Sequence, residues 1–337
     1  MDSVMEHPFP KSVSTAEKTK RLQEVVSPED TLAILINADP DAMASALALK
    51  RFFWRKVRRT LIYHVNPIQR ADNLAFIKLL KIDLKPIRHL KPTEITKWAL
   101  LDSQPHHHEQ FRDRKFDIII DHHPLGASAK GSFVDVKENY GANATIMTEY
   151  LRARKIRPSA KLATALFYGI KTDTDNFVRG SLPNDINAFR YLYELTNMNI
   201  IKKIESSEMT RKTLASYRLA MEKLVFLKDI AFVHLEEVDN PDVLVIIADF
   251  FMKLAEVTWS IVSGVFNKKL IIILRNAGFR SDAGKTAEKL FGRWGGVAGG
   301  HKTAARAEVP LNAVLGENAR DASNLEQFVL KSLKEFK

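Results

Sequence analysis

Residues 116–126 of the chain read FDIIIDHHPLG. The centre of this stretch is a short run of isoleucines, residues 118–120, with polar residues on both sides. This pattern predicts a buried strand in a parallel sheet that is covered on both faces. Asp121, His122 and His123 then come at the carboxyl end of the strand, which is the edge where open α/β sheets bind their ligands. Taken alone, these three residues fit a functional site and a solvated loop equally well.

The segments around this strand alternate between strand-like and helix-like patterns. Such alternation predicts parallel strands joined by crossover helices, and therefore an α/β fold with a doubly wound parallel sheet. We expect strands at 31–37, 61–65, 99–102 and 116–121, and helices at 42–57, 72–80, 142–154 and 159–172.

The second half of the chain predicts a smaller α/β unit. Residues 184–217 read as a charged, helical connecting region without a strong strand. Beyond it we expect strands at 230–235, 261–266 and 270–274, and helices at 242–253 and 283–291. The predicted order is an N-terminal extension (1–30), a doubly wound domain (31–183), a helical linker (184–217) and a smaller α/β domain (218–337).

Length and composition indicate a soluble protein of two domains. A chain of 337 residues can bury two hydrophobic cores. The hydrophobic content of 45% and the mean hydropathy of -0.18 are typical of globular proteins in water. The first residues lack the apolar centre of a signal peptide, and no apolar run is long enough to cross a bilayer. We therefore expect a cytoplasmic protein with no membrane partner.

The absence of cysteine and the positive charge restrict the chemistry. Without cysteine, disulfides, thiolate metal sites and cysteine nucleophiles are excluded. Any metal must be held by Asp, Glu, His or Asn, which suits ions such as Mn²⁺ or Mg²⁺. Lys and Arg number 51 against 40 Asp and Glu, so the net charge of +11 favours anionic partners such as phosphate esters or nucleic acid. The basic residues are spread along the chain, and most are expected to solvate the surface.

Acids and imidazoles follow apolar segments at four places in the first domain. If these segments end at one edge, their carboxylates converge, and two bare carboxylates ~4 Å apart repel by about 4 kcal/mol at an effective dielectric of ~20. With imidazoles alongside, a divalent metal is the natural counterion. The residues are Asp39 and Asp41, Asp102, Asp121 with His122 and His123, and Asp173.

These segments resemble a known family. NADPDAMASALAL, LLDSQP, IIIDHHP and GIKTDTDNF occur in the order of the four motifs of the DHH phosphoesterases, the superfamily of RecJ-like nucleases, nano-RNases, pAp phosphatases and family II pyrophosphatases. LIIILRNAGF and GGVAGGHKTAARAEVPL resemble the DHH-associated domain that binds substrate in the nuclease and phosphatase branch. The resemblance covers about residues 32–311, and its DHH and GGH elements are the most specific.

The resemblance implies a site for two metal ions, with Mn²⁺ expected and Mg²⁺ or another divalent ion as the alternative. Asp39 would bind the first metal and Asp41 the second, while Asp102 would bridge both. His122 and Asp173 would complete the second metal.

The resemblance also implies catalytic and substrate-binding residues. His123 would face the scissile phosphate, and Asp121 would fix an imidazole tautomer. The glycines of 292–300 do not follow a first strand as a dinucleotide fingerprint does, so a backbone cradle for a phosphate or base is expected there. The substrate-binding candidates are Arg275, Gly299, Gly300 and His301.

One position departs from the family pattern. Where the first motif usually carries a histidine ligand, this chain has Asn37, whose neutral amide is a poorer ligand for Mn²⁺ than imidazole. His64, at the end of the next strand, is a possible substitute. The departure leaves open a descendant of the family that binds nucleotides without turnover.

A run of three histidines, residues 106–108, follows Pro105. The run is compatible with a metal site, but its place at a polar helix start favours a solvated surface role.

The sequence as a whole predicts a metal-dependent phosphoesterase acting on short nucleotides. The candidate substrates are very short oligonucleotides, 3'-phosphoadenosine 5'-phosphate (pAp) and linear dinucleotides, with no requirement for long nucleic acid. The alternatives are a DHH-fold nucleotide-binding or regulatory protein without turnover, and an inorganic pyrophosphatase or polyphosphatase. A homodimer is left open.

Overall fold

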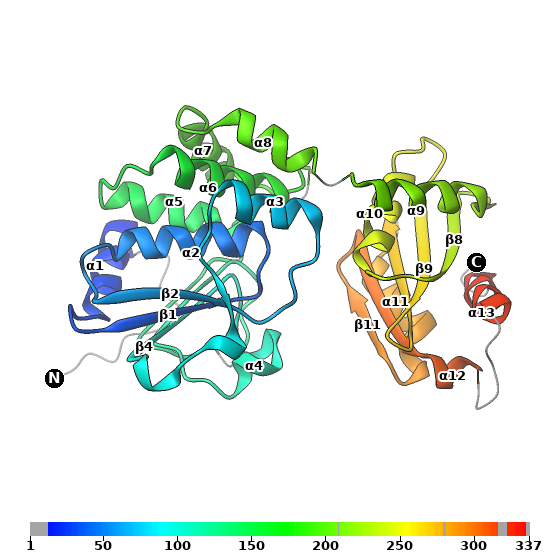
Figure 1. Cartoon of the computed structure of the whole chain (residues 1–337), viewed down its shortest axis with the longest axis horizontal. Helices are drawn as coiled ribbons and strands as arrows, with labels where there is room; N and C mark the ends of the chain where they lie inside the picture. Colours follow the sequence, from blue (N-terminus) through cyan, green and yellow to red (C-terminus); the bar gives the residue numbers. More distant parts are fainter. Residues whose placement is uncertain are drawn as a thin grey trace. The chain divides into compact units, whose positions relative to one another are not determined.

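A computed structural model of the chain describes residues 13–127, 129–178, 180–207, 209–278, 281–315 and 322–334. The chain forms two compact units (Figure 1), which we call unit 1 (Met1–Glu208) and unit 2 (Met209–Lys337). Within the described residues, no helix has both the length and the apolar character needed to cross a membrane.

Unit 1 contains a six-stranded parallel sheet, as the alternating pattern predicts. Its strand order is β3-β2-β1-β4-β5-β6, so the chain runs outward from β1 in one direction and from β4 in the other. The point between β1 and β4, where the order reverses, is where doubly wound sheets open a crevice for ligands. The strands are β1 (Thr31–Ile36), β2 (Arg59–His64), β3 (Lys85–Pro86), β4 (Lys97–Leu101), β5 (Ile118–Asp121) and β6 (Phe133–Val136).

The central strands are apolar because both faces of the sheet are covered. Every residue of β1 is buried, and so is every residue of β5. Ile34 and Ile36 enter the core beneath the main helical layer, whereas Ala33 and Leu35 enter a smaller core on the opposite face. This alternation is the two-residue period of a strand. It leaves the polar residues after β1 and β5 at the carboxyl edge.

Helices cover this sheet and extend the unit at both ends. Leu22 of α1 joins the main core, and Lys18 of the same helix forms a buried ion pair with Asp135 of β6. Part of the expected N-terminal extension therefore packs on unit 1, while residues 1–12 lie outside the described residues. The helices of unit 1 are α1 (Thr15–Glu24), α2 (Pro40–Phe52), α3 (Ala71–Leu79), α4 (Glu109–Arg112), α5 (Asn143–Ala153), α6 (Ala160–Asp173), α7 (Pro183–Tyr193) and α8 (Met198–Glu205), with short 3₁₀ helices η1 (Ile87–His89), η2 (Pro92–Glu94) and η3 (Pro105–His107).

Unit 2 is built on a mostly antiparallel sheet of strand order β11-β12-β10-β9-β8-β7, in which β8 and β9 are parallel. One face packs against α9 and α10, and the other against α11 and α13. The strands are β7 (Val225–Leu227), β8 (Ile230–Glu237), β9 (Trp259–Phe266), β10 (Lys269–Asn276), β11 (Val297–Gly300) and β12 (Ala304–Pro310). The helices are α9 (Arg211–Glu222), α10 (Asp242–Phe251), α11 (Ala283–Phe291), α12 (Leu311–Leu315) and α13 (Ala322–Lys334), with the 3₁₀ helix η4 (Gly292–Trp294).

The stretch expected as a helical linker, 184–217, is helical but divides between the units. Helices α7 and α8 contribute Ala188, Leu192, Ile201 and Ile204 to the core of unit 1. Helix α9 contributes Tyr217 to a core of unit 2.

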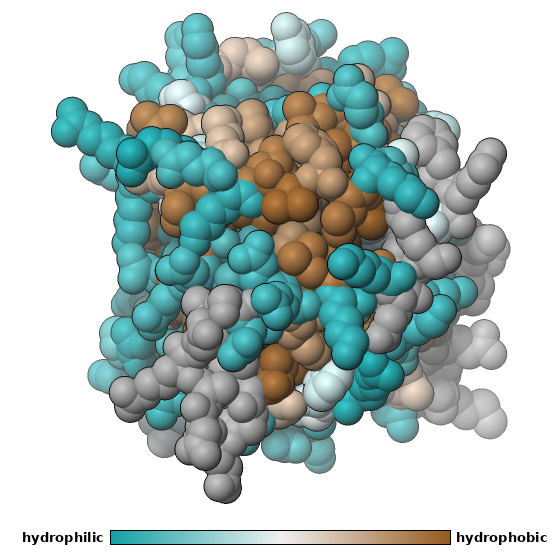
Figure 2. Space-filling view, turned by 90° about the vertical axis from the view of Figure 1, so that its right-hand side faces the viewer, coloured by the Kyte–Doolittle hydropathy of each residue, from teal (hydrophilic) through white to brown (hydrophobic). Residues whose placement is uncertain are grey.

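The surface of unit 2 carries exposed apolar residues. Figure 2, in which unit 2 faces the viewer, shows apolar residues gathered at the centre of the view with hydrophilic residues around them. β7 is an edge strand, and its Phe226 is 55% exposed. A sheet edge with exposed apolar side chains can pair with a further strand. The homodimer stays a prediction.

Candidate active site

Carboxylates and imidazoles from four segments of unit 1 converge at the carboxyl edge of the parallel sheet. Two groups of three have ligand atoms that all lie within 4.8 Å of one another: Asp41, His122 and Asp173, and Asp102, His122 and His123. Three of the four segments are the ends of β1, β4 and β5, which are neighbours in the sheet. Asp173 instead arrives at the C-terminal end of α6.

Asp39 and Asp41 are fixed by the beginnings of two helices. Asp39 is the N-cap of α2, and its Oδ1 accepts a hydrogen bond from the Ala42 amide at 2.8 Å. The carboxylate of Asp41 accepts from the amides of Asn143 (2.6 Å) and Ala144 (2.7 Å), which begin α5. Helix N-termini favour negative charge, so both carboxylates are held in place by backbone donors.

A glycine permits the close approach of α2 and α6. A Cβ atom at Gly169 would lie 3.1 Å from the Cα atom of Asp41 and 3.2 Å from its Oδ1. The hydrogen of a glycine avoids this crowding, and α6 can then end beside Asp41. Asp173 reaches the cluster because of this packing.

Asp102 follows β4 directly and has a left-handed backbone conformation, with φ of +55°. Asp and Asn tolerate this region better than most residues, and backbone strain of this kind concentrates at functional sites. The side chain is buried, and its Oδ1 has no hydrogen-bond partner within the described part of the chain. A buried carboxylate oxygen without a donor requires a cation to be stable.

His122 places its Nε2 atom between two carboxylates. Its Nδ1 lies 3.0 Å from the carbonyl oxygen of Tyr140, to which it donates, so the neutral ring carries its lone pair on Nε2. Nε2 is 3.2 Å from Oδ1 of Asp102 and 3.1 Å from Oδ2 of Asp173, and it has no hydrogen-bond partner among the described residues. Neighbouring ligands in an octahedral shell of ~2.1 Å radius lie ~3.0 Å apart. The residues present therefore fit a divalent metal ion.

The groups of the cluster shift one another's pKa values: burial opposes the charged form of His122, but its hydrogen bonds with Asp102 and Asp173 and the charge of Asp102 outweigh burial and raise the pKa of His122. Burial and the charge of Asp173 raise the pKa of Asp39 to about 6. Burial, together with the neighbouring carboxylates, raises the pKa values of Asp41 and Asp102 well above the usual range. Without a metal these carboxylates keep their protons to a higher pH than free carboxylates do, and metal binding would displace the protons.

His123 is oriented by a buried pair behind it. Its Nδ1–H donates to Oδ1 of Asp121 at 2.8 Å, and the Gln104 amide nitrogen donates to Oδ2 of Asp121 at 2.6 Å. Burial alone would raise the pKa of Asp121, but the hydrogen bonds from His123 and Gln104 outweigh it and lower that pKa. The His123 side chain is 38% exposed, so the ring is held from the inside and presented to the outside.

Gln104 is a positioning residue that can be tested by stability. In addition to donating to Asp121, the Gln104 side chain accepts a hydrogen bond from the Gly126 amide at 2.7 Å. Gln104→Leu keeps the volume but leaves buried polar groups unpaired, and we expect the free energy of unfolding in denaturant to fall by about 1–3 kcal/mol. As a control, Gln110→Leu changes an exposed glutamine of α4 and should alter stability by no more than about 0.5 kcal/mol. Equal effects of the two changes would contradict this role.

Asn37, which stands where the family pattern has a histidine, and His64, the possible substitute, lie at the ends of the neighbouring strands β1 and β2. Asn37 follows β1 and is exposed. His64 pairs with Ile36 in the sheet register, and its Nδ1 lies 2.7 Å from the carbonyl oxygen of Asn66. The Asn66 amide in turn binds the backbone of Ala38, at 2.6 Å and 2.9 Å. In the described part of the chain, His64 is absent from the close groups of acids and imidazoles.

His107 lies beside the site. The sequence predicted only a solvated surface role for residues 106–108 and did not indicate this position. The ring of His107 is 5.2 Å from that of His123, centroid to centroid, and a third close group consists of His107, Asp121 and His123. The side chain is exposed, as expected, but η3 places it next to the DHH residues. The periodicity of the sequence gives no signal for this approach.

Three of the four substrate-binding candidates line one pocket of unit 2. A cavity of about 270 Å³ is lined in part by Arg275 of β10 and by Gly299 and Gly300 of β11. His301 follows in the turn to β12, where its amide donates to the Ala304 carbonyl oxygen. Arg275 Nε lies 2.5 Å from Oδ1 of Asp249, and this ion pair partly neutralises the positive charge of Arg275.

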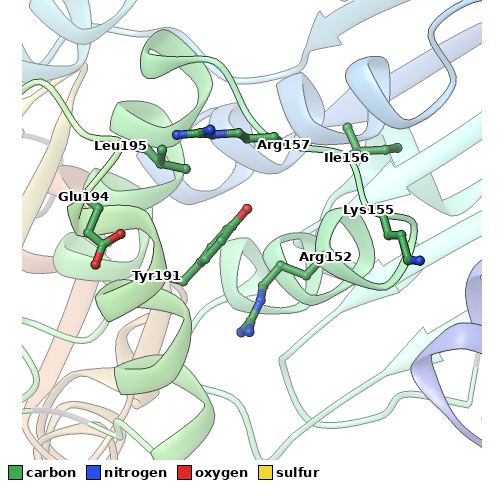
Figure 3. Close-up of a pocket in the computed structure, with 7 residues that line it drawn as sticks. All are labelled: Arg152, Lys155, Ile156, Arg157, Tyr191, Glu194 and Leu195. Atoms are coloured by element: carbon green, nitrogen blue, oxygen red, sulfur yellow. The ribbon is translucent and has the colours of Figure 1, made fainter.

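A second cavity, of about 360 Å³, lies in unit 1 and has a basic lining (Figure 3). The guanidinium carbon of Arg152 lies 4.8 Å from the centroid of the Tyr191 ring. None of its lining residues belongs to the close carboxylate and imidazole groups of the described chain, so this cavity is not part of the candidate site. It is lined by Arg152, Lys155, Ile156, Arg157, Tyr191, Glu194 and Leu195.

Comparisons with known proteins agree with this geometry. Residues 32–170 match the model of the DHH family, N-terminal domain. The chain is 34% identical over 288 residues to the uncharacterized protein MJ1633 of Methanocaldococcus jannaschii, a match that covers 85% of this chain and 59% of that relative. The chain therefore spans less than two thirds of this relative's length.

Solved structures share the fold. An exopolyphosphatase-related protein from Bacteroides fragilis matches with a TM-score of 0.74 at 14% identity, covering 97% of this chain and 98% of that one. RecJ from Thermus thermophilus, solved in complex with Mn²⁺, matches with a TM-score of 0.52 at 14% identity, covering 95% of this chain and 54% of that one. The four motif segments thus assemble at one sheet edge, and the match to the DHH family, N-terminal domain, covers residues 32–170.

Proposed function

We propose that this protein is a metal-dependent phosphoesterase that hydrolyses phosphate esters of short nucleotides. The observation that carries the proposal is the convergence of His122 Nε2 with Oδ1 of Asp102 and Oδ2 of Asp173 at 3.1–3.2 Å. The match of residues 32–170 to the DHH family supports the same chemistry.

The proposed site holds two divalent ions, with Mn²⁺ as the first choice. Asp39 and Asn37 would hold the first ion, and Asp41, His122 and Asp173 the second. Asp102 would bridge the two ions. The RecJ structure was solved with Mn²⁺, which supports this choice of ion. When bound, such ions lower the pKa of a coordinated water and stabilise negative charge on phosphate oxygens.

The protein's own residues orient the groups around the phosphate. The carbonyl oxygen of Tyr140 accepts a hydrogen bond from Nδ1–H of His122 and so leaves Nε2 as the atom available to a metal ion. Asp121, held by Gln104, keeps the His123 ring protonated at Nδ1. His123 then faces the scissile phosphate through Nε2, where it can hold or donate a proton. Asp121 acts through His123 and does not itself contact the substrate.

Unit 2 is proposed to bind the remainder of the substrate. Its pocket offers the backbone of Gly299 and Gly300 with the guanidinium of Arg275, and His301 follows directly along the chain. Backbone amides and a guanidinium are suited to a terminal phosphate. A pocket of about 270 Å³ suits a nucleotide-sized group, and we propose that no long nucleic acid is required.

A substrate panel tests this function. Purified full-length protein with Mn²⁺ is incubated with pAp, linear dinucleotides, short oligonucleotides and inorganic pyrophosphate, and the products are separated by chromatography. We expect mononucleotide or phosphate release from one or more of the nucleotides, abolished by EDTA. Measurable nucleotide binding without turnover would instead support a regulatory protein. Cleavage of pyrophosphate alone would support a pyrophosphatase.

Asn37 gives a second test, directed at the first ion. Asn37→His replaces a neutral amide by an imidazole, which is a better ligand for Mn²⁺. We expect the dissociation constant of the weaker Mn²⁺ site to fall, as measured by calorimetric titration, because imidazole binds Mn²⁺ more tightly than a neutral amide oxygen does. Unchanged Mn²⁺ binding would show that residue 37 does not face the ion.

A further inference from the structure

Four imidazoles form a row that leads from the buried carboxylates to the surface of unit 1. The ring centroids of His122 and His123 are 4.4 Å apart, those of His123 and His107 are 5.2 Å apart, and those of His107 and His106 are 4.3 Å apart. The His122 side chain is 12% exposed, that of His123 is 38% exposed, and His107 is exposed. His107 is therefore the first imidazole outside His123 that a ligand can reach.

The backbone fixes the tautomer of His107. The amide of Gln104 donates to Nδ1 of His107 at 3.1 Å, and the amide of His107 donates to the Gln104 carbonyl oxygen at 2.9 Å. An Nδ1 that accepts a hydrogen bond carries the lone pair, so the proton of the neutral ring is on Nε2. Partial desolvation of this exposed side chain outweighs the charge of Asp121 and lowers the pKa of His107, which favours the neutral form. His107 thus offers one N–H donor next to His123.

We propose that His107 contacts the substrate, donating from Nε2–H to an oxygen of the phosphate group that His123 faces. The inference rests on the proposed function, and it assigns a residue outside the DHH motif to the recognition of phosphate. The ligand class is a phosphate monoester or diester bound at the metal-facing edge of unit 1. His107 would supply a neutral, directional donor beyond the metal ligands.

A third metal ion fits this position less well. His107, Asp121 and His123 have ligand atoms within 4.8 Å of one another, but these atoms are already engaged. Oδ1 of Asp121 accepts from His123 and Oδ2 accepts from Gln104, while Nδ1 of His107 accepts from the Gln104 amide. A metal ligated by Asp121 and by Nδ1 of His107 would have to break these hydrogen bonds. A donor role for Nε2 leaves all of them intact.

Two substitutions distinguish the function of Nδ1 of His107 from that of Nε2. His107→Asn places an amide oxygen near the Nδ1 position, which keeps the acceptor for the Gln104 amide but removes the outer donor. His107→Gln extends an amide group to the Nε2 position and keeps a donor there. Inorganic phosphate is titrated into the Mn²⁺-loaded full chain, and Mn²⁺ binding and the thermal unfolding midpoint are measured for the same variants.

We expect His107→Asn to weaken phosphate binding about 10-fold or more, since hydrogen bonds to charged groups contribute at least that much, while Mn²⁺ affinity and the unfolding midpoint stay unchanged. His107→Gln should bind phosphate within about 3-fold of the wild type, because it retains the donor. The control His89→Asn, which changes an exposed histidine of η1, should behave as the wild type.

Three results would overturn the inference. The first is that His107→Asn binds phosphate as tightly as the wild type does, and the second is that the wild-type protein binds no phosphate. The third is that His107→Asn binds fewer Mn²⁺ ions than the wild type, which would identify His107 as a metal ligand. If the substrate panel shows no turnover but His107→Asn loses phosphate binding, the proposed hydrolysis fails while the role of His107 in anion binding stands.

Discussion

Asp102→Asn is expected to lower the rate of hydrolysis by at least about 100-fold and, in the same protein, to raise the thermal stability of the metal-free form. The rate falls because an amide is a poor replacement for a carboxylate between two ions, and losses of this size follow the removal of one electrostatic group from an active site. The stability rises because Asp102 is a buried carboxylate whose Oδ1 has no donor and whose pKa is raised well above the usual range by burial and the charges of Asp41 and Asp39.

The choice of asparagine keeps the backbone unchanged. Asp102 has φ of +55°, a region that Asn also adopts readily, so the change alters charge with little strain. Turnover is measured with saturating Mn²⁺, and the unfolding midpoint is measured in EDTA. Asp185→Asn is the matched control, because Asp185 is also buried but accepts hydrogen bonds from the amides of Gly141 and Leu182 and from the hydroxyl of Thr145. Asp185→Asn should therefore lower stability.

An Asp102→Asn protein that retains turnover would contradict the bridging role. One that loses stability in EDTA, as Asp185→Asn should, would show that Asp102 is satisfied without a metal.

Mn²⁺ is expected to stabilise the protein more strongly at pH 7.5 than at pH 4.5. At an ion concentration of 100 times the dissociation constant, a single site adds about 2.7 kcal/mol to the free energy of unfolding. The metal-free protein is weakened as pH rises, because the folded pKa of Asp39 is about 6 and its ordinary value is 3.8. Between pH 3.8 and about pH 6, Asp39 holds a proton in the folded state that it has released in the unfolded state.

The sign follows from this proton difference. Below pH 3.8 Asp39 is protonated in both states and has no effect; above about pH 6 it is ionised in both, and the folded metal-free protein has lost about 3 kcal/mol of stability. Asp41 and Asp102, whose pKa values are raised further, extend the loss to higher pH. Differential scanning of unfolding at both pH values, with Mn²⁺ and with EDTA, measures the difference. An Mn²⁺ effect that is equal at both pH values would argue against ion binding by these carboxylates.

The central strands of unit 1 could be predicted because their sequence carries a local signal. β1 and β5 are short, apolar runs buried on both faces; β1 ends directly before the polar Asn37, and β5 ends at Asp121. β6 was missed because Phe133–Val136 is four residues long and includes a charged residue, Asp135, whose burial depends on an ion pair with Lys18 and a hydrogen bond from the Tyr150 hydroxyl. β11 was missed because its glycines favour a loop, and the strand forms by pairing with β12.

The site could be predicted only for residues that lie at the ends of apolar segments. Asp39, Asp102, His122 and His123 follow from that rule, and the sheet order brings them together. Asp173 was expected after an apolar stretch, but the reason for its approach is the packing of α6 at Gly169.

Other contributors depend on tertiary structure. The Tyr140 carbonyl that orients His122 is a backbone group and has no residue-type signal. Gln104 lies within the LLDSQP segment, so the resemblance included it, but its contact with Asp121 depends on the fold. His107 depends on the path of η3 and was read as a surface residue for that reason.

The number of Mn²⁺ ions that bind per chain, measured together with the rate of nucleotide hydrolysis in one titration, tests the central claim most directly. Metal-stripped protein is titrated with Mn²⁺, bound ions are counted by equilibrium dialysis, and turnover of the best substrate of the panel is followed at each point. We predict two ions per wild-type chain and turnover that rises with their occupancy. A chain that binds no Mn²⁺, or turnover that is the same in EDTA, would contradict the claim that this DHH site is a two-metal phosphoesterase centre.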